Sequence, residues 1–365
     1  MNILLLTYQG DMAGATNSIF YLAKGLSERG HTVVVGCRRE SLLNRLLLDR
    51  APRVIRKEMT FRGKTNLKNM IEIRDAVRQY DIQIINAQST IDRYTAIFAN
   101  WLFRLNAIVV HTRRQKPRSD GGWLQRWFIV YATKSIITVS NQLRETLIKN
   151  GYPAGHVKAI FNGLPREHYE NYDKEKVTEL RRQLGIAESD IVVGCISRMK
   201  KQEQLVEAIP FLPPDVKILF VGIEQGRLDD VADQYGVKDR IIYAGKVLPA
   251  EVQNYYHLVT VNVLTTSMDG FGLTLLESMA AGVPVVATRV FGVIDVLDNE
   301  KNGLWYESGD SRQLAEKLMV ALYDTQRRAQ LIENGYKAAF ETFSLDRTID
   351  NYEQFFGELI DKYNA

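Results

Sequence analysis

The first half of the chain alternates short apolar runs with longer segments of helical periodicity. The runs 3–8 (ILLLTY) and 32–37 (TVVVGC) are typical of buried strands, and residues 18–30 between them carry apolar residues at helical spacing. A strand, a helix and a strand at this spacing predict a βαβ unit with a parallel strand pair. The same patterns predict further strands at 81–88, 106–112 and 135–140, and a helix at 140–151 that begins at Ser140 or Asn141 and ends at Gly151.

A second alternating set begins near residue 190. Strands are predicted at 191–197, 216–222, 240–245, 259–264 and 283–288, with helical segments between them. The stretch after Asn162-Gly163 is polar and contains Pro165, which is typical of a domain boundary. We therefore expect an α/β protein of two Rossmann-like, doubly wound domains, residues 1–162 and 163–343, that face each other across a cleft. Ligands of such sheets bind at the carboxyl ends of the strands.

The composition is that of an ordinary globular protein of 365 residues. The two cysteines, Cys37 and Cys195, lie in apolar runs and are expected to be buried free thiols, which fits a reducing cytoplasm. Nothing in their number or spacing suggests a disulfide framework or a zinc site. The first residues lack the pattern of a signal peptide, and no apolar run reaches the roughly 18 residues of a membrane span.

Charge is distributed unevenly along the chain. The formal net charge of +4 divides into +14 for residues 1–160 and −10 for residues 161–365. Such asymmetry suggests an anionic partner for the first half, although drift of solvated surface charge would also produce it.

The stretch 269–287, DGFGLTLLESMAAGVPVVA, predicts a loop, a helix and a strand. Gly270 and Gly272 would let the backbone approach a ligand, and the helix start near Leu273 and Thr274 would favour phosphate. Glu277, one turn into the helix, and Asp269, before the glycines, could each hold vicinal hydroxyls. Phosphate between two such carboxylates would describe a sugar nucleotide, although a solvated helix residue and an ordinary turn residue are equally plausible from the spacing alone.

This stretch resembles the donor-binding signature of retaining glycosyltransferases of family 4, which have the two-domain GT-B fold, including enzymes that build bacterial lipopolysaccharide and other cell-surface glycans. Further similarity lies in 135–164 (SIITVSNQLRETLIKNGYPAGHVKAIFNGL), 195–209 (CISRMKKQEQLVEAI) and 295–310 (DVLDNEKNGLWYESGD). The segment 344–356 is similar to the family's terminal helix, so residues 344–365 are expected to cross back onto the first domain.

The resemblance implies roles for individual donor-side residues. Arg198 with Lys200, or Lys201, would grip the diphosphate, on which negative charge accumulates when the sugar leaves. Glu277 would hold the ribose, and Asp269 and the 270–272 backbone would contact the transferred sugar and phosphates. The base would lie against the backbone at Gly245, Lys246 and Val247. The full implied donor set is Gly14, Arg198, Lys200, Lys201, Gly245, Lys246, Val247, Asp269, Gly270, Phe271, Gly272, Leu273, Thr274 and Glu277.

Two positions depart from the family pattern. Asp269 replaces the usual Glu, which puts the identity of the donor sugar in question, and Thr16 stands where an acid is common. Gly14 would let the first loop pass close to the diphosphate, and His111 matches the family's histidine beside the donor sugar. No Asp-x-Asp occurs, and the cations could replace a metal ion, so neither a metal nor another cofactor is expected.

The acceptor side is expected in the basic first domain. Basic residues and aromatics alternate over 111–134, which suits an anionic membrane surface or an acidic glycan better than nucleic acid. An ordinary core helix would explain the second part of this segment equally well. The expected acceptor or membrane surface comprises Arg113, Arg114, Lys116, Arg118, Trp123, Arg126 and Trp127.

These inferences predict a cytoplasmic glycosyltransferase, peripheral on the inner face of the membrane. It would move a sugar from a nucleoside-diphosphate sugar to an anionic or lipid-linked glycan, such as a lipopolysaccharide core. Two alternatives stay open, namely a sugar-nucleotide epimerase or hydrolase of the same fold and a non-catalytic sugar-nucleotide-binding protein.

Overall fold

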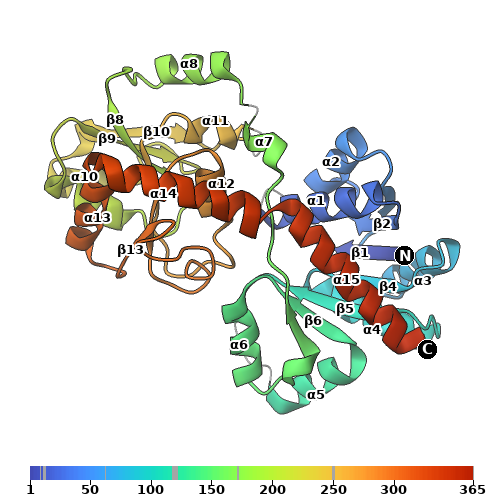
Figure 1. The fold of residues 1–365 in the computed structure, drawn as a ribbon. Helices are drawn as coiled ribbons and strands as arrows, with labels where there is room; N and C mark the ends of the chain where they lie inside the picture. The colour runs from blue at the N-terminus through green and yellow to red at the C-terminus, as the bar shows by residue number, and fades with distance from the viewer. Residues whose placement is uncertain are drawn as a thin grey trace. The chain divides into compact units, whose positions relative to one another are not determined.

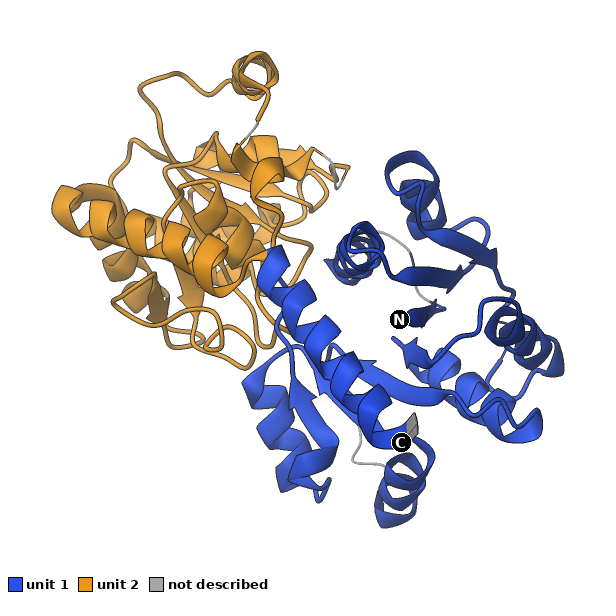
Figure 2. Cartoon of the chain, turned by 45° about the vertical axis from the view of Figure 1, so that its right-hand side comes forward, with its two compact units in different colours: residues 1–163, 345–365 blue, residues 164–344 orange. Residues whose placement is uncertain are grey.

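A computed structural model describes residues 1–8, 10, 14–61, 63–116, 122–170, 172–248 and 251–364. The chain divides into two compact units: unit 1, made of residues 1–163 and 345–365, and unit 2, made of residues 164–344 (Figure 2). Each unit is built on one parallel sheet with helices on both faces (Figure 1). The predicted α/β class with two doubly wound domains is confirmed.

Unit 1 has a seven-stranded sheet in the order β3-β2-β1-β4-β5-β6-β7. Its strands are β1 (Asn2–Thr7), β2 (Thr32–Cys37), β3 (Ile55–Glu58), β4 (Ile84–Ala87), β5 (Ile108–Arg113), β6 (Ser135–Thr138) and β7 (Val157–Ala159). Its helices are α1 (Gly14–Glu28), α2 (Leu42–Arg50), α3 (Leu67–Gln79), α4 (Thr90–Leu102), α5 (Gly122–Ala132), α6 (Asn141–Lys149), the short η1 (Ala154–His156) and α15 (Leu345–Asn364).

Strand β1 shows why this sheet is buried on both faces. Ile3 and Leu5 belong to the core that α1, α2 and α15 cover, whereas Leu4 and Leu6 belong to the core under α3, α4 and α5. Successive side chains of a strand point to opposite faces, so a continuous apolar run supplies both cores.

Unit 2 has a six-stranded parallel sheet in the order β10-β9-β8-β11-β12-β13. Its strands are β8 (Ile191–Ile196), β9 (Val216–Val221), β10 (Ile241–Gly245), β11 (Val261–Leu264), β12 (Val285–Thr288) and β13 (Leu304–Tyr306). Its helices are α7 (Arg166–Glu170), α8 (Lys174–Gln183), α9 (Glu203–Ala208), η2 (Ile209–Phe211), α10 (Asp229–Tyr235), η3 (Lys238–Arg240), α11 (Val252–Tyr256), α12 (Leu273–Ala280), α13 (Ser311–Tyr323), α14 (Thr325–Lys337) and the π-helical η4 (Ala338–Thr342).

In both sheets the strand order reverses at one point. The chain builds outward from β1 through β2 to β3 and then returns to place β4 on the other side of β1; in unit 2 the same happens at β8, between β9 and β11. The helices that follow the two central strands therefore leave on opposite faces of the sheet. Ligands of doubly wound sheets bind at this switch point.

Two further expectations can be compared with the structure. Cys37 and Cys195 are both free and buried, as predicted. Among the described residues, no helix has the length and apolar character that crossing a bilayer requires.

Candidate functional site in unit 2

The switch point of unit 2 brings together the loops that follow β8 and β11. These two strands are parallel neighbours, with Val261 opposite Val193 and Asn262 opposite Gly194. Their carboxyl ends consequently lie side by side, and the loops 197–202 and 265–272 leave the sheet at the same edge. The sequence motifs around Arg198 and Asp269, far apart along the chain, therefore meet in one place.

An ion pair joins the two loops. The ammonium of Lys200 contacts Oδ2 of Asp269, and both side chains are mostly buried, at 17% and 21% exposure. Burial opposes ionisation of Asp269, but Lys200 and two backbone N–H donors outweigh it, so the pKa of Asp269 lies below its ordinary value. The carboxylate is therefore charged at neutral pH, and Lys200 rather than Lys201 is the lysine that faces the 269–272 turn.

The Gly-Phe-Gly turn is organised by Asp269 itself. Oδ1 of Asp269 accepts hydrogen bonds from the backbone N–H of Gly272 at 2.8 Å and of Phe271 at 3.1 Å. These two N–H groups were expected to face a ligand, and in the structure they face Asp269 instead. The Asp side chain is one methylene shorter than that of Glu, which keeps its carboxylate close to its own turn.

Two glycines make this turn possible. Gly272, the N-cap of α12, has a φ of 78°, a conformation that favours glycine. Gly292 has a φ of 83°, and a Cβ at this position would lie 2.1 Å from the carbonyl oxygen of Asp269. The backbone N–H of Asp269 donates to the carbonyl of Phe291 at 3.0 Å. The 291–292 segment therefore supports the turn from behind, and any side chain larger than hydrogen at 292 would displace it.

The first turn of α12 leaves donors available. Within the described part of the chain, the N–H groups of Leu273 and Thr274 have no backbone or side-chain acceptor, and the buried hydroxyl of Thr274 is also without a partner. Free N–H groups and the helix dipole together favour an anion at a helix start. Leu273 and Thr274 thus present free donors at the start of α12, and their contact with phosphate stays a prediction.

Glu277 lies one turn further along α12 and is held by two tyrosines. The Tyr256 hydroxyl, on α11, donates to Oε2 of Glu277 at 3.0 Å, and the Tyr169 hydroxyl, on α7, also bonds this carboxyl. Burial raises the pKa of Glu277 to about 7, against the opposing effect of the two hydroxyl donors. Glu277 is therefore ionised, and able to accept hydrogen bonds with both oxygens, only above about pH 7.

Arg198 is the exposed member of the site. No ion pair or hydrogen bond of its guanidinium occurs within the described ranges. Its backbone is fixed by Gln202, which is fully buried and whose amide donates to the Arg198 carbonyl at 2.9 Å and to the Ser197 hydroxyl at 3.0 Å. Lys201 is exposed and has no side-chain partner among the residues described. Arg198 is therefore a free cation on a fixed loop beside the Lys200–Asp269 pair.

The loop after β10 lies two strands away from β8. The carbonyl of Gly245 accepts from the N–H of Gly222 at 2.8 Å, and exposed Lys246 forms an ion pair with Glu224 at 2.7 Å. Gly245, Lys246 and Val247 therefore lie at the same carboxyl edge as the other donor-side residues.

Unit 1 carries the remaining expected site residues at its own carboxyl edge. Gly14 is exposed at the start of α1, and Thr16, two residues later, is buried. His111, on β5, is 4% exposed, and Nη1 of Arg93 donates to its Nδ1 at 3.1 Å. Burial first, and then the charges of Arg93 and Arg113, lower the pKa of His111 well below its ordinary value. The imidazole is therefore neutral at physiological pH.

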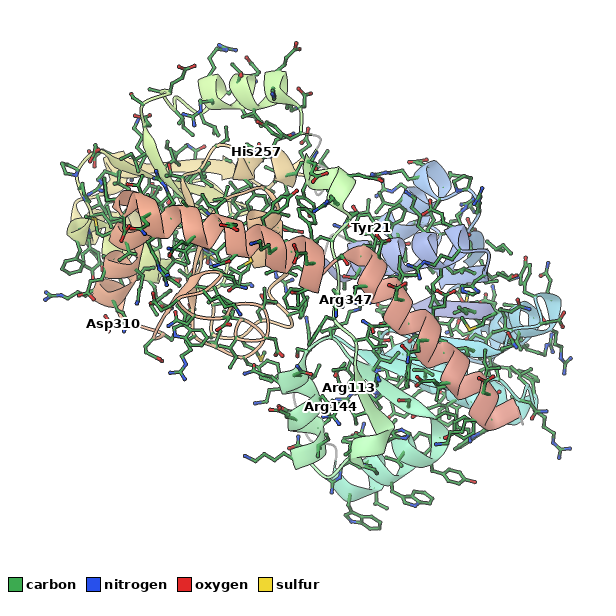
Figure 3. The ribbon with its side chains drawn as sticks, in the orientation of Figure 1. Tyr21, Arg113, Arg144, His257, Asp310 and Arg347 are labelled. Atoms are coloured by element: carbon green, nitrogen blue, oxygen red, sulfur yellow. The ribbon has the colours of Figure 1, made fainter. Side chains whose placement is uncertain are left out.

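The expected acceptor surface separates into two groups. Arg113, the last residue of β5 (Figure 3), is partly buried over Tyr152, and Arg114 donates to Asn162 at 2.9 Å and to Gln88 at 3.0 Å. Arg114 is bonded within the unit and Arg113 lies over a ring, so neither side chain extends over an open surface as the expected acceptor surface requires.

The second group lies on α5 and near it. Trp123 and Trp127 are 68% and 61% exposed, whereas Arg126 is partly buried next to Gly151. Lys116 is exposed, and Arg118 lies outside the described residues. The aromatic part of the expected surface is therefore open to solvent.

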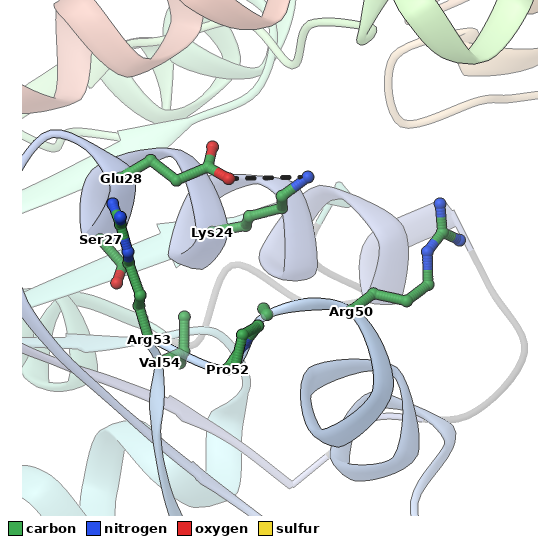
Figure 4. A pocket seen from close by; sticks show the side chains of 8 residues that line it. Lys24, Ser27, Glu28, Arg50, Pro52, Arg53 and Val54 are labelled. Atoms are coloured by element: carbon green, nitrogen blue, oxygen red, sulfur yellow. Dashed lines mark ion pairs between the residues drawn. The ribbon is translucent and has the colours of Figure 1, made fainter.

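A shallow pocket in unit 1 lies elsewhere (Figure 4). It is lined by the carboxyl ends of α1 and α2 and the residues after α2, including Arg50, Pro52 and Arg53, and contains the Lys24–Glu28 ion pair. The carboxyl end of a helix in a βαβ unit lies near the amino end of the next strand. This pocket is therefore at the edge of the sheet opposite to that of His111.

Among the residues of these sites that escaped the sequence analysis are Tyr256, Gln202 and Arg93. Each reads locally as part of an ordinary helix or loop. Their importance comes from side-chain partners, Glu277, Arg198 and His111, that are 4 to 21 positions away along the chain. Only the Arg93 position gave a signal, since Arg93 and its neighbour Asp92 are the charged residues of α4.

Two family models match the chain. The model of glycosyl transferases group 1 matches residues 176–338, and that of glycosyltransferase family 4 matches residues 12–168. An uncharacterised glycosyltransferase of Methanocaldococcus jannaschii is 29% identical over 225 residues, 59% of this chain and 58% of that protein. The chain thus spans less than two thirds of the length of this relative.

Two further matches extend over more of the chain. A lipopolysaccharide core biosynthesis mannosyltransferase of Rhizobium meliloti is 26% identical over 282 residues, 73% of this chain and 76% of that protein. The crystal structure of Anabaena HepE in complex with UDP-glucose has a TM-score of 0.81 at 22% identity and covers 99% of this chain and 100% of its own. The predicted fold and resemblance are confirmed: the chain belongs to the group 1, family 4 glycosyltransferases and has their two-domain GT-B fold.

Proposed function

We propose that the protein is a retaining glycosyltransferase that moves a sugar from a nucleoside-diphosphate sugar to an anionic or lipid-linked glycan. The observation that carries the proposal is the arrangement at the unit 2 switch point. The carboxyl edge of the sheet there carries two cations, Lys200 and the unpaired Arg198. It also carries the unpaired N–H groups of Leu273 and Thr274. Fixed cations and oriented donors are what a leaving diphosphate requires.

In the proposed reaction, the bond between the anomeric carbon and the diphosphate oxygen breaks, and its electron pair stays on the diphosphate. Arg198, Lys200 and the start of α12 stabilise the charge that develops there. The acceptor oxygen bonds to the same carbon on the same face, and its proton is released. Retention of configuration is taken from the family resemblance and is tested by the anomeric signal of the product in NMR.

The donor is proposed to bind through its nucleoside as well. Glu277 would accept hydrogen bonds from the ribose hydroxyls, and the backbone at 245–247 would contact the base. The Anabaena relative HepE was crystallised with UDP-glucose, which makes UDP-sugars the first donors to test. We propose that no metal or other cofactor is needed, because the two cations and the helix start already supply positive charge to the diphosphate.

The acceptor is proposed to be reached at an anionic membrane face. Six large side chains of α4 and α5 form what we call the aromatic face. They are Trp101, Leu102, Trp123, Leu124, Trp127 and Tyr131, each between 45% and 68% exposed. Trp127 stacks on Tyr131 at 5.5 Å, and Tyr131 contacts Trp101 edge-on at 6.1 Å, so these rings connect α5 with α4. Exposed tryptophan and tyrosine beside basic residues are typical of a bilayer interface. The Rhizobium relative, a lipopolysaccharide core enzyme, is consistent with such an acceptor.

The deciding experiment combines binding with turnover. Thermal unfolding is measured with UDP-, GDP-, ADP-, TDP- and CMP-sugars, and a ligand at a hundred times its Kd should stabilise the protein by about 2.7 kcal/mol. Nucleotide release is then measured with and without glycolipid acceptors. Release that depends on acceptor supports the transferase, whereas release without acceptor would indicate a hydrolase. A protein that binds no nucleotide sugar would contradict the proposal.

A further inference from the structure

Two guanidinium groups and one imidazole form a buried cluster in unit 1, which we call the Arg93 cluster. It consists of Arg93 on α4 and His111 and Arg113 on β5. Arg93 is 2% exposed, His111 is 4% exposed, and Arg113 is partly buried. Residues 111 and 113 point to the same face of the sheet, the face on which α4 packs. The cluster lies where β5 ends, at the carboxyl edge.

The Arg93 cluster has no negative partner. Throughout the described ranges, neither arginine forms an ion pair, and Nε of Arg93 and Nε of Arg113 are both buried without an acceptor. The adjacent Asp92 does not compensate them, because its oxygens accept from the backbone N–H groups of Tyr8, Gln88 and Ser89. Burying a charge without a counter-charge is costly, and proteins normally pair such groups.

Neighbouring aromatic rings compensate the positive charge of the Arg93 cluster only in part. The guanidinium of Arg93 lies 4.9 Å from the centroid of the Tyr94 ring, and that of Arg113 lies 5.9 Å from that of Tyr152. Ring faces attract cations but offer no acceptor to a buried Nε–H. Lys64, which is exposed, adds a further positive charge 5.2 Å from the Tyr94 ring. Burial lowers the pKa of Arg93 and of Arg113, in keeping with charges held in an apolar environment.

We propose that the Arg93 cluster is a subsite for an oxyanion carried by the acceptor, a phosphate or a carboxylate. The proposal rests on the proposed transferase function and gives the anionic acceptor a specific partner. A guanidinium group can donate two parallel hydrogen bonds to two oxygens of a phosphate or a carboxylate. The unpaired Nε–H groups of Arg93 and Arg113 are the donors from which such an anion would accept hydrogen bonds. His111, neutral and bonded to Arg93, holds that guanidinium in place.

The test uses Arg93→Met and Arg113→Met, with Arg78→Met as a matched control because Arg78 is an exposed residue of α3 in the same unit. Thermal unfolding of the full chain is followed against inorganic phosphate and, separately, malonate, at constant ionic strength. One of the two anions should stabilise the unmodified protein and the control. In either cluster variant this effect should be weakened, with an apparent affinity at least about tenfold lower, as expected for one lost charged hydrogen-bond partner.

The two anions distinguish the two chemical sources. A response to phosphate points to a phosphorylated acceptor, and one to malonate points to an acidic sugar. Each variant should also unfold at a temperature equal to or above that of the unmodified protein without anions, because an uncompensated buried charge has been removed. A merely structural arginine would give the opposite shift.

A titration with UDP separates this proposal from the function itself. UDP should stabilise Arg93→Met and Arg113→Met as it does the unmodified protein, since their substitutions lie in unit 1. If both variants keep the full anion response while Arg198→Ala loses it, the anion binds only in unit 2 and the subsite is overturned, although the transferase proposal stands. If neither anion stabilises the unmodified protein, the subsite is likewise overturned. Should Arg93→Met fail to fold, the partly buried Arg113 position decides.

Discussion

The ammonium of Lys200, in the loop after β8, is paired with the carboxylate of Asp269, in the loop after β11. The pair joins the two loops at the switch point of unit 2. The folded-state pKa of Asp269 is lowered, so the pair contributes stability above the ordinary pKa of an aspartate, and this contribution is lost as the pH falls through the lower, folded value.

Replacement of Lys200 should therefore reduce stability in a pH-dependent way. Lys200→Met leaves a mostly buried carboxylate without its cation, which typically costs about 3 kcal/mol near neutral pH. The difference from the unmodified protein should shrink as the pH falls below about 4, the ordinary pKa of an aspartate, towards the lower folded-state pKa of Asp269. Thermal unfolding between pH 3 and 8 measures both. A constant difference across this range would show that the pair is not responsible, and Lys201→Met is the control.

Glu277 should make donor binding pH-dependent. Its raised pKa, about 7, means that the hydrogen-bond-accepting carboxylate is lost as the pH falls below that value, so UDP affinity should decline between pH 8 and 6. For an acid with a raised folded pKa, stability is fully present below the unfolded pKa and falls as the pH rises through about 7. Glu277→Gln should consequently bind UDP with a pH-independent, weaker affinity and unfold at a higher temperature than the unmodified protein at pH 8.

Tyr256 should tune this transition. Its hydroxyl donates to Oε2 of Glu277 at 3.0 Å and thereby favours the ionised form. Tyr256→Phe removes the donor and should move the midpoint of the UDP-binding pH profile upward, while saturating affinity at high pH changes less. Calorimetric titration over the same pH range gives the midpoint. An unchanged midpoint would mean that the hydroxyl serves packing alone, and Tyr255→Phe, on the adjacent position, is the matched control.

Arg198 should matter for turnover and not for folding. Its side chain is exposed and has no partner in the described part of the chain, so Arg198→Ala should unfold within about 0.5 kcal/mol of the unmodified protein. Loss of a charge at the developing diphosphate should reduce kcat about a hundredfold or more. Normal turnover in this variant, measured as acceptor-dependent nucleotide release, would remove Arg198 from the site.

The aromatic face should mediate binding to anionic vesicles. A variant carrying Trp123→Ser and Trp127→Ser should partition onto phosphatidylglycerol vesicles about tenfold more weakly, because two exposed indoles are lost from the interface. Phe211→Ser is the control, since Phe211 is similarly exposed, at 48%, but belongs to unit 2. Sedimentation with vesicles provides the measurement, and equal partitioning of the two variants would argue against a membrane role for this face.

The hydrophobic pattern predicted the central strands of both sheets and missed three strands at the sheet edges. The run 32–37 is β2 residue for residue, and 191–197 extends β8 by one. The missed strands, β3, β7 and β13, are three or four residues long and lie at or near sheet edges, where one side is often solvated. β3, with sequence IRKE, alternates between partly buried and exposed positions and contains no apolar run. Such strands are determined by the neighbouring strand and not by their own composition.

The candidate site was predicted to the level of motifs but not of contacts. The loop and helix of the 269–277 segment follow from local spacing, whereas Arg198 was assigned through the family resemblance. The bonds from Asp269 to its own turn, the tyrosines around Glu277 and the pairing of His111 with Arg93 join elements distant in sequence. Long-range side-chain geometry of this kind has no local signal. For the same reason, the basic residues of 113–126 appeared continuous in sequence although the fold separates them.

Helix α15 gives the order in which the chain can fold during synthesis. Ile349, Tyr352 and Phe356 of this helix belong to the same buried core as β1 and α1, and Ile349 packs against Gly25. The first unit to leave the ribosome therefore keeps an open apolar surface until residues 345–364 have been translated, while unit 2 has all its segments earlier. Nascent unit 1 is the part that should depend on a holding chaperone, and a ribosome stalled before residue 345 should present it in a protease-sensitive form.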